Sequence, residues 1–432
     1  MELQEFSFGN FRSFKEINTL NLAAAKLKSK YKTVDENNVF TTDNSENVSF
    51  LKSKVIYGAN ASGKSNIIKS LVTFIKIINN SVKDAHVLHM VDPFRLSTET
   101  EHEPSFFQII FWDKNTKYRY GFELNNERIL SEWLYGKPGE REMCFFIREG
   151  NDIIELDKTN FSEGDKLNSL LIDDKENDLF RNDSLFLSAL SSFGFGKLSK
   201  HIIECISSFI IISGLGHQGM YEYAGDSLDN IEKKQYILNF LKKGDIGIED
   251  LISVELSNKD LPDNLDNNIR KEYENKKIKL LLSSRKKFDE RMKFVENESF
   301  SFRIHESEGT KKLFELSPFI YNALKENKTI IIDEFDARFH PLLTRKILEL
   351  FNSKDNKGAQ LIFTTHNTNL LSSKLLRRDQ IEFVEKDRYG ASSLYSLAQF
   401  KGVRNDASFE KDYIHGKYGA IPFLGNFKNL VD

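Results

Sequence analysis

Residues Gly58–Ser65, which read GANASGKS, have the residue types and the spacing needed to hold a chain of phosphates. They match the pattern G-x-x-x-x-G-K-[ST], in which glycines let successive backbone N–H groups point at phosphate oxygens. In this pattern Lys64 reaches the β- and γ-phosphates and the Ser65 hydroxyl holds Mg²⁺. The predicted nucleotide contacts are Gly58, Ala59, Asn60, Ala61, Ser62, Gly63, Lys64, Ser65 and Asn66.

The segments on either side of this loop are those that a phosphate site requires. The apolar residues 55–57 lead into the loop as a short strand, and Asn66–Ile78 has the apolar spacing of a helix. A helix that begins at the loop adds the positive end of its dipole to the site. The alternative, a glycine-rich turn with a solvated lysine, is therefore disfavoured.

Two carboxylates follow a second apolar run, Lys328–Glu334 (KTIIIDE). Consecutive apolar β-formers are typical of a parallel strand covered on both faces, and ligands bind at the carboxyl ends of such strands. We expect Asp333 to hold Mg²⁺ through water, and Glu334 to orient or deprotonate an attacking water. Without the phosphate loop, two solvated acids at a strand end would be the better interpretation.

A third apolar run, Gln360–Thr364, is followed by His366. A lone histidine is usually structural. This one follows a strand about thirty residues after Glu334, a separation that predicts a neighbouring strand whose end reaches the γ-phosphate. We therefore favour a functional role for His366.

The residues Glu306–Phe314 (ESEGTKKLF) open a helix just upstream of the carboxylate strand. Ser307 and Gly309 can present a hydroxyl and backbone N–H groups to an anion at the start of this helix. They can equally form an ordinary N-cap. Spacing alone leaves both interpretations open.

Composition limits the class of protein. The 432 residues carry 61 basic and 64 acidic side chains, so no global field attracts nucleic acid. Cys144 and Cys205 are too few for a disulfide framework or a Cys-rich metal site, and we expect both to be ordinary core residues. With no signal segment and no apolar run near the roughly 20 residues that span a bilayer, we expect a cytoplasmic protein without membrane contact.

The chain divides by pattern into three parts. Residues 1–135 hold the phosphate loop and aromatic-rich antiparallel strands, 136–275 read as an inserted, mainly helical lobe, and 276–432 complete the nucleotide fold. The stretch Lys276–Lys293 holds eight basic residues against two acids. It could contact nucleic acid, but a solvated strand pair is the preferred interpretation.

Taken in order, the motifs GANASGKS, ESEGTKKLF, IIIDEFD and FTTHN resemble the ABC-class ATPase heads of the SMC, RecF and OLD group. The closest resemblance is to the stand-alone AAA-family ATPases of abortive-infection and restriction-linked loci, of the AbiL and RloA kind. It covers roughly the first seventy and the last 130 residues, and it reaches the insert only through RNDSLFLSAL. The implied fold is α/β: a P-loop NTPase head of ABC type, with a mixed sheet, an antiparallel β subdomain and a helical insert.

The resemblance also implies ATP and Mg²⁺ as ligands and a composite site between two copies. Ser307 and Gly309 would contact the γ-phosphate of ATP bound by a second subunit, and His366 would be the switch histidine. Lys64, Ser65, Asp333 and Glu334 would act on the nucleotide of their own chain. Asp336 would lie in the dimer-contacting loop, and the glutamine-loop position stays open between Gln108 and the region of Pro93 and Phe94. A homodimer or a larger assembly of dimers is therefore expected.

Three functions are compatible with these motifs. The leading hypothesis is an anti-phage ATPase that senses infection and regulates a separate, nuclease-like effector. The second is a RecF-like DNA clamp in repair or replication, for which the basic run is the only local support. A nucleotide sensor that does not hydrolyse ATP is disfavoured because Glu334 is present.

Overall fold

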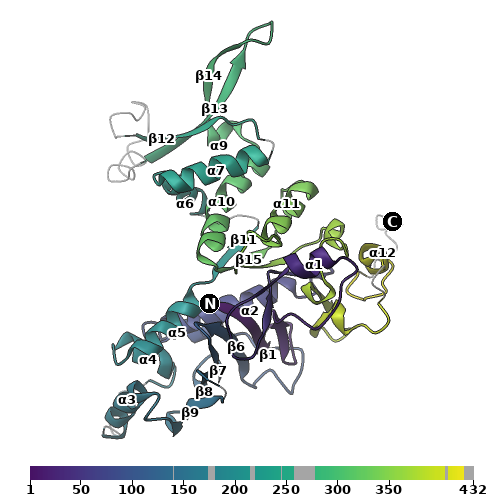
Figure 1. Ribbon diagram of the computed structural model, residues 1–432. Helices are drawn as coiled ribbons and strands as arrows, with labels where there is room; N and C mark the ends of the chain where they lie inside the picture. Colours follow the sequence, from purple (N-terminus) through teal and green to yellow (C-terminus); the bar gives the residue numbers. More distant parts are fainter. Residues whose placement is uncertain are drawn as a thin grey trace, which may run out of the picture.

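The computed structural model describes residues 1–139, 141–173, 181–214, 219–244, 246–256, 278–403 and 407–422. Two large sheets form the body of the molecule, and a β-hairpin arm projects away from it at the top of Figure 1. The arrangement confirms the predicted α/β class, with a mixed sheet, an antiparallel sheet and helical insertions.

The first sheet carries the strand ends that the sequence singled out. Its order is β11-β15-β16-β5-β17-β18, and every neighbouring pair is parallel except β17 with β18. The strands are β5 (Ser53–Gly58), β11 (Ile210–Ser213), β15 (Thr329–Asp333), β16 (Gln360–Thr364), β17 (Ile381–Lys386) and β18 (Ser392–Ser396). All of β5 and β16 and most of β15 and β17 are buried, as expected of parallel strands covered on both faces.

The second sheet is antiparallel, with the order β10-β9-β8-β7-β6-β1-β2. Its strands are β1 (Glu2–Gly9), β2 (Asn18–Asn21), β6 (Ser105–Asp113), β7 (Thr116–Leu124), β8 (Ile129–Lys137), β9 (Met143–Glu149) and β10 (Asp152–Leu156). Lys114 and Asn115 join β6 to β7 with φ values of 46° and 67°. Positive φ at both central residues is the geometry of a two-residue hairpin turn, and β6 and β7 are two of the aromatic-rich antiparallel strands that the sequence predicts within residues 1–135.

Helix α2 (Lys64–Asn80) links the two sheets. Its apolar stripe packs on the antiparallel sheet, where the Phe74 ring lies 5.1 Å from Phe122 and 5.5 Å from Phe6. The helix that begins at the phosphate loop is therefore fixed along its length by a buried aromatic core.

The region between the phosphate loop and β15 holds α3 (Ser162–Asp173), α4 (Phe186–Ser192), α5 (Lys197–Ser207), α6 (Met220–Ser227) and α7 (Ile231–Lys243). The expected boundary at residue 136 falls inside β8, and β9 and β10 extend the antiparallel sheet beyond it. Strand β11, only four residues long, crosses into the parallel sheet. The segment 136–275 is thus helical in part, and it shares strands with both large sheets.

A third sheet forms the projecting arm from β12 (Asp250–Leu256), β13 (Ile278–Phe288) and β14 (Phe294–Ser301). The described part of the basic run is therefore a strand pair, as preferred from the sequence; Lys276 and Lys277 lie outside the described residues. Four of its basic side chains pair with carboxylates: Lys279 with Asp226 and Asp229, Arg285 with Glu306, Lys286 with Glu249, and Lys287 with Glu296 and Glu298.

The remaining elements connect or cover these sheets. They are α1 (Lys32–Asn37), β3 (Val39–Thr41), β4 (Ser49–Leu51), η1 (Val87–Met90), α9 (Phe302–His305), α10 (Glu308–Glu326), α11 (Pro341–Phe351), η3 (Thr368–Leu370), η4 (Arg378–Gln380), η5 (Leu397–Gln399) and α12 (Phe409–Ile414). Within the described ranges, none of the helices combines the length and apolar character needed to cross a bilayer.

A buried carboxylate explains why the segment RNDSLFLSAL docks where it does. Glu132 on β8 accepts hydrogen bonds from the backbone N–H groups of Phe186 (2.6 Å) and Leu187 (3.0 Å) at the start of α4. It also accepts one from the Tyr120 hydroxyl (2.9 Å) and pairs with Arg148 at 3.4 Å. Glu132 and Arg148 are both fully buried, and burial raises the pKa of Glu132. This network ties α4 to the antiparallel sheet.

Candidate functional site

Three adjacent parallel strands bring the predicted site residues to one edge of the sheet. Strand β5 ends in the phosphate loop, β16 lies beside it, and β15 lies beside β16. Asp333 ends β15 and His366 follows β16, so both reach the edge from which Lys64 projects. The carboxylates of Asp333 and Glu334 act electrostatically on the Lys64 ammonium and oppose the lowering of its pKa.

Lys64 is held by its own loop. Its Nζ donates to the carbonyl oxygens of Gly58 (2.9 Å) and Ala59 (3.0 Å), and burial lowers its pKa to about 8 against the opposing pull of Asp333 and Glu334. The Ser62 Oγ is buried without a hydrogen-bond partner among the described residues. A buried ammonium and an unpaired hydroxyl in one loop are groups that a phosphate would satisfy.

Two serines hold the phosphate loop in place. No motif in the sequence identified either of them. Ser392, at the start of β18, donates its hydroxyl to the Ser62 carbonyl at 2.6 Å, and Asn66 Nδ2 donates to Ser13 Oγ at 2.9 Å. Gly63 has φ of +117°, and a Cβ there would lie 2.7 Å from Ser392 Oγ and 2.8 Å from Ser13 Oγ. The glycine is therefore required both by its backbone conformation and by the close approach of the two serines.

Thr364 positions the two carboxylate residues. Its hydroxyl accepts a hydrogen bond from the Glu334 N–H at 2.7 Å and so donates its own proton to Asp333 Oδ1 at 2.6 Å. The Phe335 N–H donates to the Thr364 carbonyl at 3.0 Å. Glu334 has φ of +52°, an uncommon conformation for this residue type that these bonds hold in place. The sequence placed Thr364 at a strand end but gave no signal for this role.

Gly214 approaches the same residues from the other side. Its N–H donates to the Asp333 carbonyl at 2.5 Å, and a Cβ built on it would lie only 2.0 Å from the Glu334 carbonyl oxygen. Gly214 directly follows β11, more than a hundred residues before Glu334 in the chain. No motif or spacing in the sequence could have identified it.

His366 is exposed at the end of β16. Partial loss of solvent around the ring lowers its pKa, and the positive charge of Lys64 lowers it further. The imidazole is therefore neutral at pH 7, with one nitrogen able to donate and the other able to accept a hydrogen bond.

Ser307 caps helix α10. This is the ordinary N-cap, one of the two interpretations that the sequence left open. Its Oγ accepts a hydrogen bond from the Thr310 N–H at 3.1 Å, and the side chain remains exposed. A Cβ built on Gly309 would lie 3.1 Å from the Arg338 carbonyl oxygen. The cap thus lies against the segment that follows Glu334.

Lys312, one turn further along α10, holds the segment that follows Glu334 by hydrogen bonds. Its Nζ donates to the carbonyl oxygens of Phe335 (2.9 Å) and Ala337, and burial lowers its pKa to about 8. Asp336, the residue expected in a dimer-contacting loop, lies between these two carbonyls and is half-buried. The helix that carries Ser307 and the strand that carries Glu334 are therefore linked directly.

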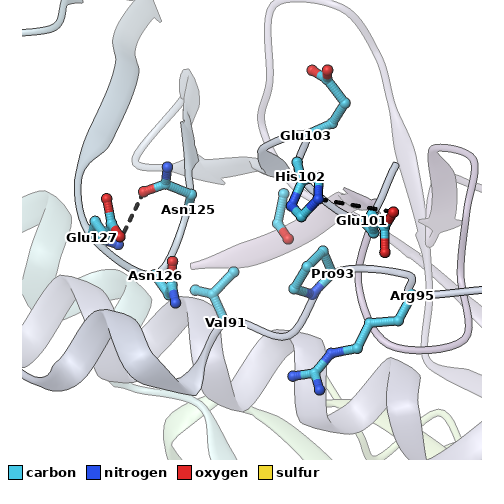
Figure 2. Close-up of a pocket in the computed structure, with 10 residues that line it drawn as sticks. Val91, Pro93, Arg95, Glu101, His102, Glu103, Asn125, Asn126 and Glu127 are labelled. Atoms are coloured by element: carbon cyan, nitrogen blue, oxygen red, sulfur yellow. Dashed lines mark hydrogen bonds and ion pairs between the residues drawn. The ribbon is translucent and has the colours of Figure 1, made fainter. Parts of the chain in front are cut away.

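One hollow, of about 380 Å³, is lined by Ala59–Ser62 of the phosphate loop, by the end of β17 and by residues 420–422. The other, of about 430 Å³, lies between Val91–Arg95 and Asn125–Glu127 (Figure 2). Its lining includes three glutamates and one arginine, a balance of charge that does not favour phosphate. Pro93 lines this hollow, so it is not placed in the cradle.

The glutamine-loop position stays open. Gln108 lies within β6, where its Oε1 accepts a hydrogen bond from Trp133 Nε1 at 3.1 Å. The Phe94 N–H donates to Asn10 Oδ1 at 2.9 Å. Both candidate positions are thus engaged in contacts within the chain.

Comparison with protein families assigns this site to a known class. Residues 55–372, more than half of the chain, match the family described as an AAA domain, putative AbiEii toxin, Type IV TA system. The matched span includes the phosphate loop, both carboxylates and His366. The chain belongs to this AAA domain family. The motif order that suggested an AAA-type ATPase is therefore confirmed at the level of the family.

Solved structures show a distant similarity. The SMC head domain from Thermotoga maritima aligns with a TM-score of 0.42 at 12% identity, covering 92% of this chain and 99% of that one. An SMC head bound to the C-winged helix domain of ScpA gives 0.42 at 13%, covering 92% and 97%. An Smc head with an extended coiled coil, bound to a ScpA domain derived from Pyrococcus furiosus, gives 0.40 at 12%, covering 96% and 99%. Comparison with curated proteins gives no match.

Proposed function

We propose that this AAA protein binds and hydrolyses ATP, dimerises around it, and regulates a separate effector in anti-phage defence. One observation carries the proposal: Lys64, Asp333, Glu334 and His366 meet at one sheet edge, with the two carboxylate residues fixed by Thr364. A cradle for phosphate and a carboxylate beside it are the two requirements for cleaving a phosphoanhydride with water.

In the proposed mechanism, different residues of the chain bind the phosphates, activate the attacking water and hold Mg²⁺. Lys64 exchanges its loop carbonyl partners for the β- and γ-phosphate oxygens, and the N-terminus of α2 adds its dipole. Glu334 accepts a proton from, or orients, the attacking water, and neutral His366 hydrogen-bonds near the γ-phosphate. Ser65 and Asp333 would hold Mg²⁺, which neutralises negative charge on the phosphates when bound.

The exposed cap of α10 supports the dimer. Ser307 and Glu308, the first residue of the helix, are both exposed, so the Ser307 hydroxyl and the N–H groups of Glu308 and Gly309 remain accessible to another molecule. With Gly309, this cap is proposed to bind the γ-phosphate of ATP held by a second copy. ATP then joins two subunits, and hydrolysis by Glu334 separates them.

The proposed context is abortive infection, with AbiL- and RloA-like ATPases as the nearest functional class. The family description names a putative toxin of a type IV toxin–antitoxin system, which agrees with a defence role. The effector is proposed to be a separate, nuclease-like protein.

The pairing of the basic run weakens the alternative of a DNA clamp. The basic run Lys276–Lys293 was the only local support in the sequence for DNA binding. Among the basic residues of this run that the structure describes, only Arg291 and Lys293 lack a carboxylate partner. Neutralised charges release few counterions from DNA. Stimulation of ATP turnover by duplex DNA would nevertheless overturn the effector model in favour of the clamp.

The test compares the purified wild type with Glu334→Gln and with Glu326→Gln, an exposed carboxylate at the end of α10. We expect Glu334→Gln to lose ATP turnover by about 10²-fold or more while retaining ATP binding, and to become a dimer in light scattering when ATP is added. Glu326→Gln should behave as the wild type. If Glu334→Gln turns ATP over normally, or keeps its apo mass with ATP bound, the proposed mechanism is wrong.

A further inference from the structure

Three metal-ligating side chains converge away from the nucleotide site. Asp113 ends β6, and His201 and Cys205 lie on α5. His201 Nε2 is 2.8 Å from Asp113 Oδ2 and 3.7 Å from Cys205 Sγ, and the three ligand atoms all lie within 4.8 Å of one another. None of these residues contributes to the phosphate loop or to the carboxylates beside it.

The separations are close to those around a tetrahedral zinc ion. With Zn–N near 2.0–2.1 Å and Zn–S near 2.3 Å, tetrahedral angles place nitrogen and sulfur ligands roughly 3.6 Å apart. The distance from His201 Nε2 to Cys205 Sγ is 3.7 Å. Nitrogen and oxygen ligands would be roughly 3.3 Å apart, so the 2.8 Å contact between His201 and Asp113 must open by about half an ångström.

The ligands are carried by rigid elements. His201 and Cys205 are four residues apart and so share one face of α5, whose Ile202 and Ile206 are fully buried. Strand β6 is paired on both sides within the antiparallel sheet. The Cys205 thiol is buried, whereas the side chains of Asp113 and His201 are 13% and 37% exposed. The cluster is therefore preorganised and still open to an entering ion.

Negative charge surrounds the thiol. The Asp113 carboxylate belongs to the same cluster of ligand atoms as Cys205 Sγ. Glu204 adds further negative charge, while the Met1 ammonium, 3.8 Å from Asp113 Oδ1, competes for that carboxylate. A bound transition metal would displace the thiol proton, because a coordinating thiol is deprotonated.

We propose that Asp113, His201 and Cys205 form a binding site for one Zn²⁺ ion, with the fourth position open to water. A thiolate, an imidazole and a carboxylate are ligands that zinc accepts together, whereas Mg²⁺ and Ca²⁺ prefer oxygen alone. The ion would cross-link α5 to the edge of the antiparallel sheet. The site is independent of the proposed ATPase activity.

The test uses the full-length chain, stripped of metal and free of nucleotide, titrated with Co²⁺ as a spectroscopic probe and with Zn²⁺ as competitor. We expect one equivalent of Co²⁺ to bind with a thiolate-to-cobalt charge-transfer band that Zn²⁺ abolishes. The second cysteine provides a matched control: Cys144→Ala on β9 should keep the band and Cys205→Ala should lose it.

Two further variants guard against a failure to fold. His201→Gln and Asp113→Asn change partly exposed side chains, and each should weaken Co²⁺ binding by about tenfold or more while circular dichroism is unchanged. Absence of the band in the wild type, or its persistence in Cys205→Ala, would overturn the proposal and leave the cluster as a hydrogen-bonded contact between α5 and β6.

Discussion

Replacing Gly214 with alanine should damage catalysis without touching the nucleotide-binding loop. A Cβ at this position would lie 2.0 Å from the Glu334 carbonyl oxygen, 2.6 Å from its carbonyl carbon and 2.7 Å from the Asp333 carbonyl oxygen. Real Cβ atoms essentially never approach another heavy atom closer than 3.0 Å. The contact is with backbone rather than with a flexible side chain, so the two segments must separate.

The required displacement sets the size of the effect. Moving from 2.0 Å to at least 3.0 Å takes 3.0 − 2.0 = 1.0 Å, and it acts on a residue already held at φ of +52°. A misplacement of about 1 Å at a catalytic group costs about 10²-fold in rate, or about 2.7 kcal/mol in activation free energy. We therefore expect kcat for ATP hydrolysis to fall by about 10²-fold in Gly214→Ala. ATP affinity should stay within about threefold, because the three atoms nearest to the added Cβ belong to Asp333 and Glu334, whereas Lys64 is held by carbonyl groups of its own loop.

The assay is steady-state phosphate release, with ATP affinity measured separately by calorimetry. Gly225→Ala is the matched control, because nothing lies within 4 Å of a Cβ at that position in α6. It should retain full turnover. If Gly214→Ala hydrolyses ATP at the wild-type rate, Gly214 does not hold Glu334 in place; if ATP affinity falls as far as kcat, the damage is global.

Three other perturbations test the loop and the core. Ser392→Ala removes the hydroxyl that holds the Ser62 carbonyl, which is worth about 1 kcal/mol. Calorimetry should therefore show several-fold weaker ATP binding, while Ser393→Ala at the exposed neighbouring position should show no change. ATP affinity should fall about tenfold from pH 7 to pH 9, since Lys64 with a pKa of about 8 loses its charge in the free protein and the phosphates bind the charged form. An affinity that does not change with pH would contradict the role assigned to Lys64. Glu132→Gln removes the carboxylate that pairs with the fully buried Arg148, so urea unfolding should show a loss of about 3–5 kcal/mol in the free energy of unfolding. A loss below about 1 kcal/mol would refute the role of the network.

Local pattern was sufficient to predict the strands and helices that carry the chemistry. The run at 328–334 has the continuous apolar character of a doubly covered strand, and β15 runs parallel between β11 and β16 as that character requires. The phosphate loop and α2 followed from fixed glycine spacing and helical periodicity. Because parallel strands end at one edge, the convergence of Asp333 and His366 with Lys64 also followed.

What the sequence could not supply are contacts between distant segments. Ser13 and Ser392 clamp the loop from positions 50 residues before and 329 residues after Gly63, and serine in a polar stretch carries no signal of such a role. Strand β11 was missed because three isoleucines followed by a serine are too short a run to show a periodicity. The paired state of the basic run was equally hidden, because the partners of Lys279 and Lys286 lie in other elements.

These distant contacts place Glu334 between two parts of the chain that can each carry a regulatory signal. On one side β11 pairs with β15 through Ser213 and Asp333, and Gly214 abuts the Glu334 carbonyl. On the other side, Lys312 of α10 donates a hydrogen bond to the carbonyl oxygen of Phe335, the residue after Glu334. The inserted helices connect both sides, because α5 leads into β11 and α6 packs on α10 through ring contacts such as Tyr223 with Phe319 at 4.7 Å. If the proposed ATPase activity holds, we expect a partner that shifts these helices by a fraction of an ångström to change the rate of hydrolysis without contacting the nucleotide, because the packed interfaces would transmit the movement to Glu334.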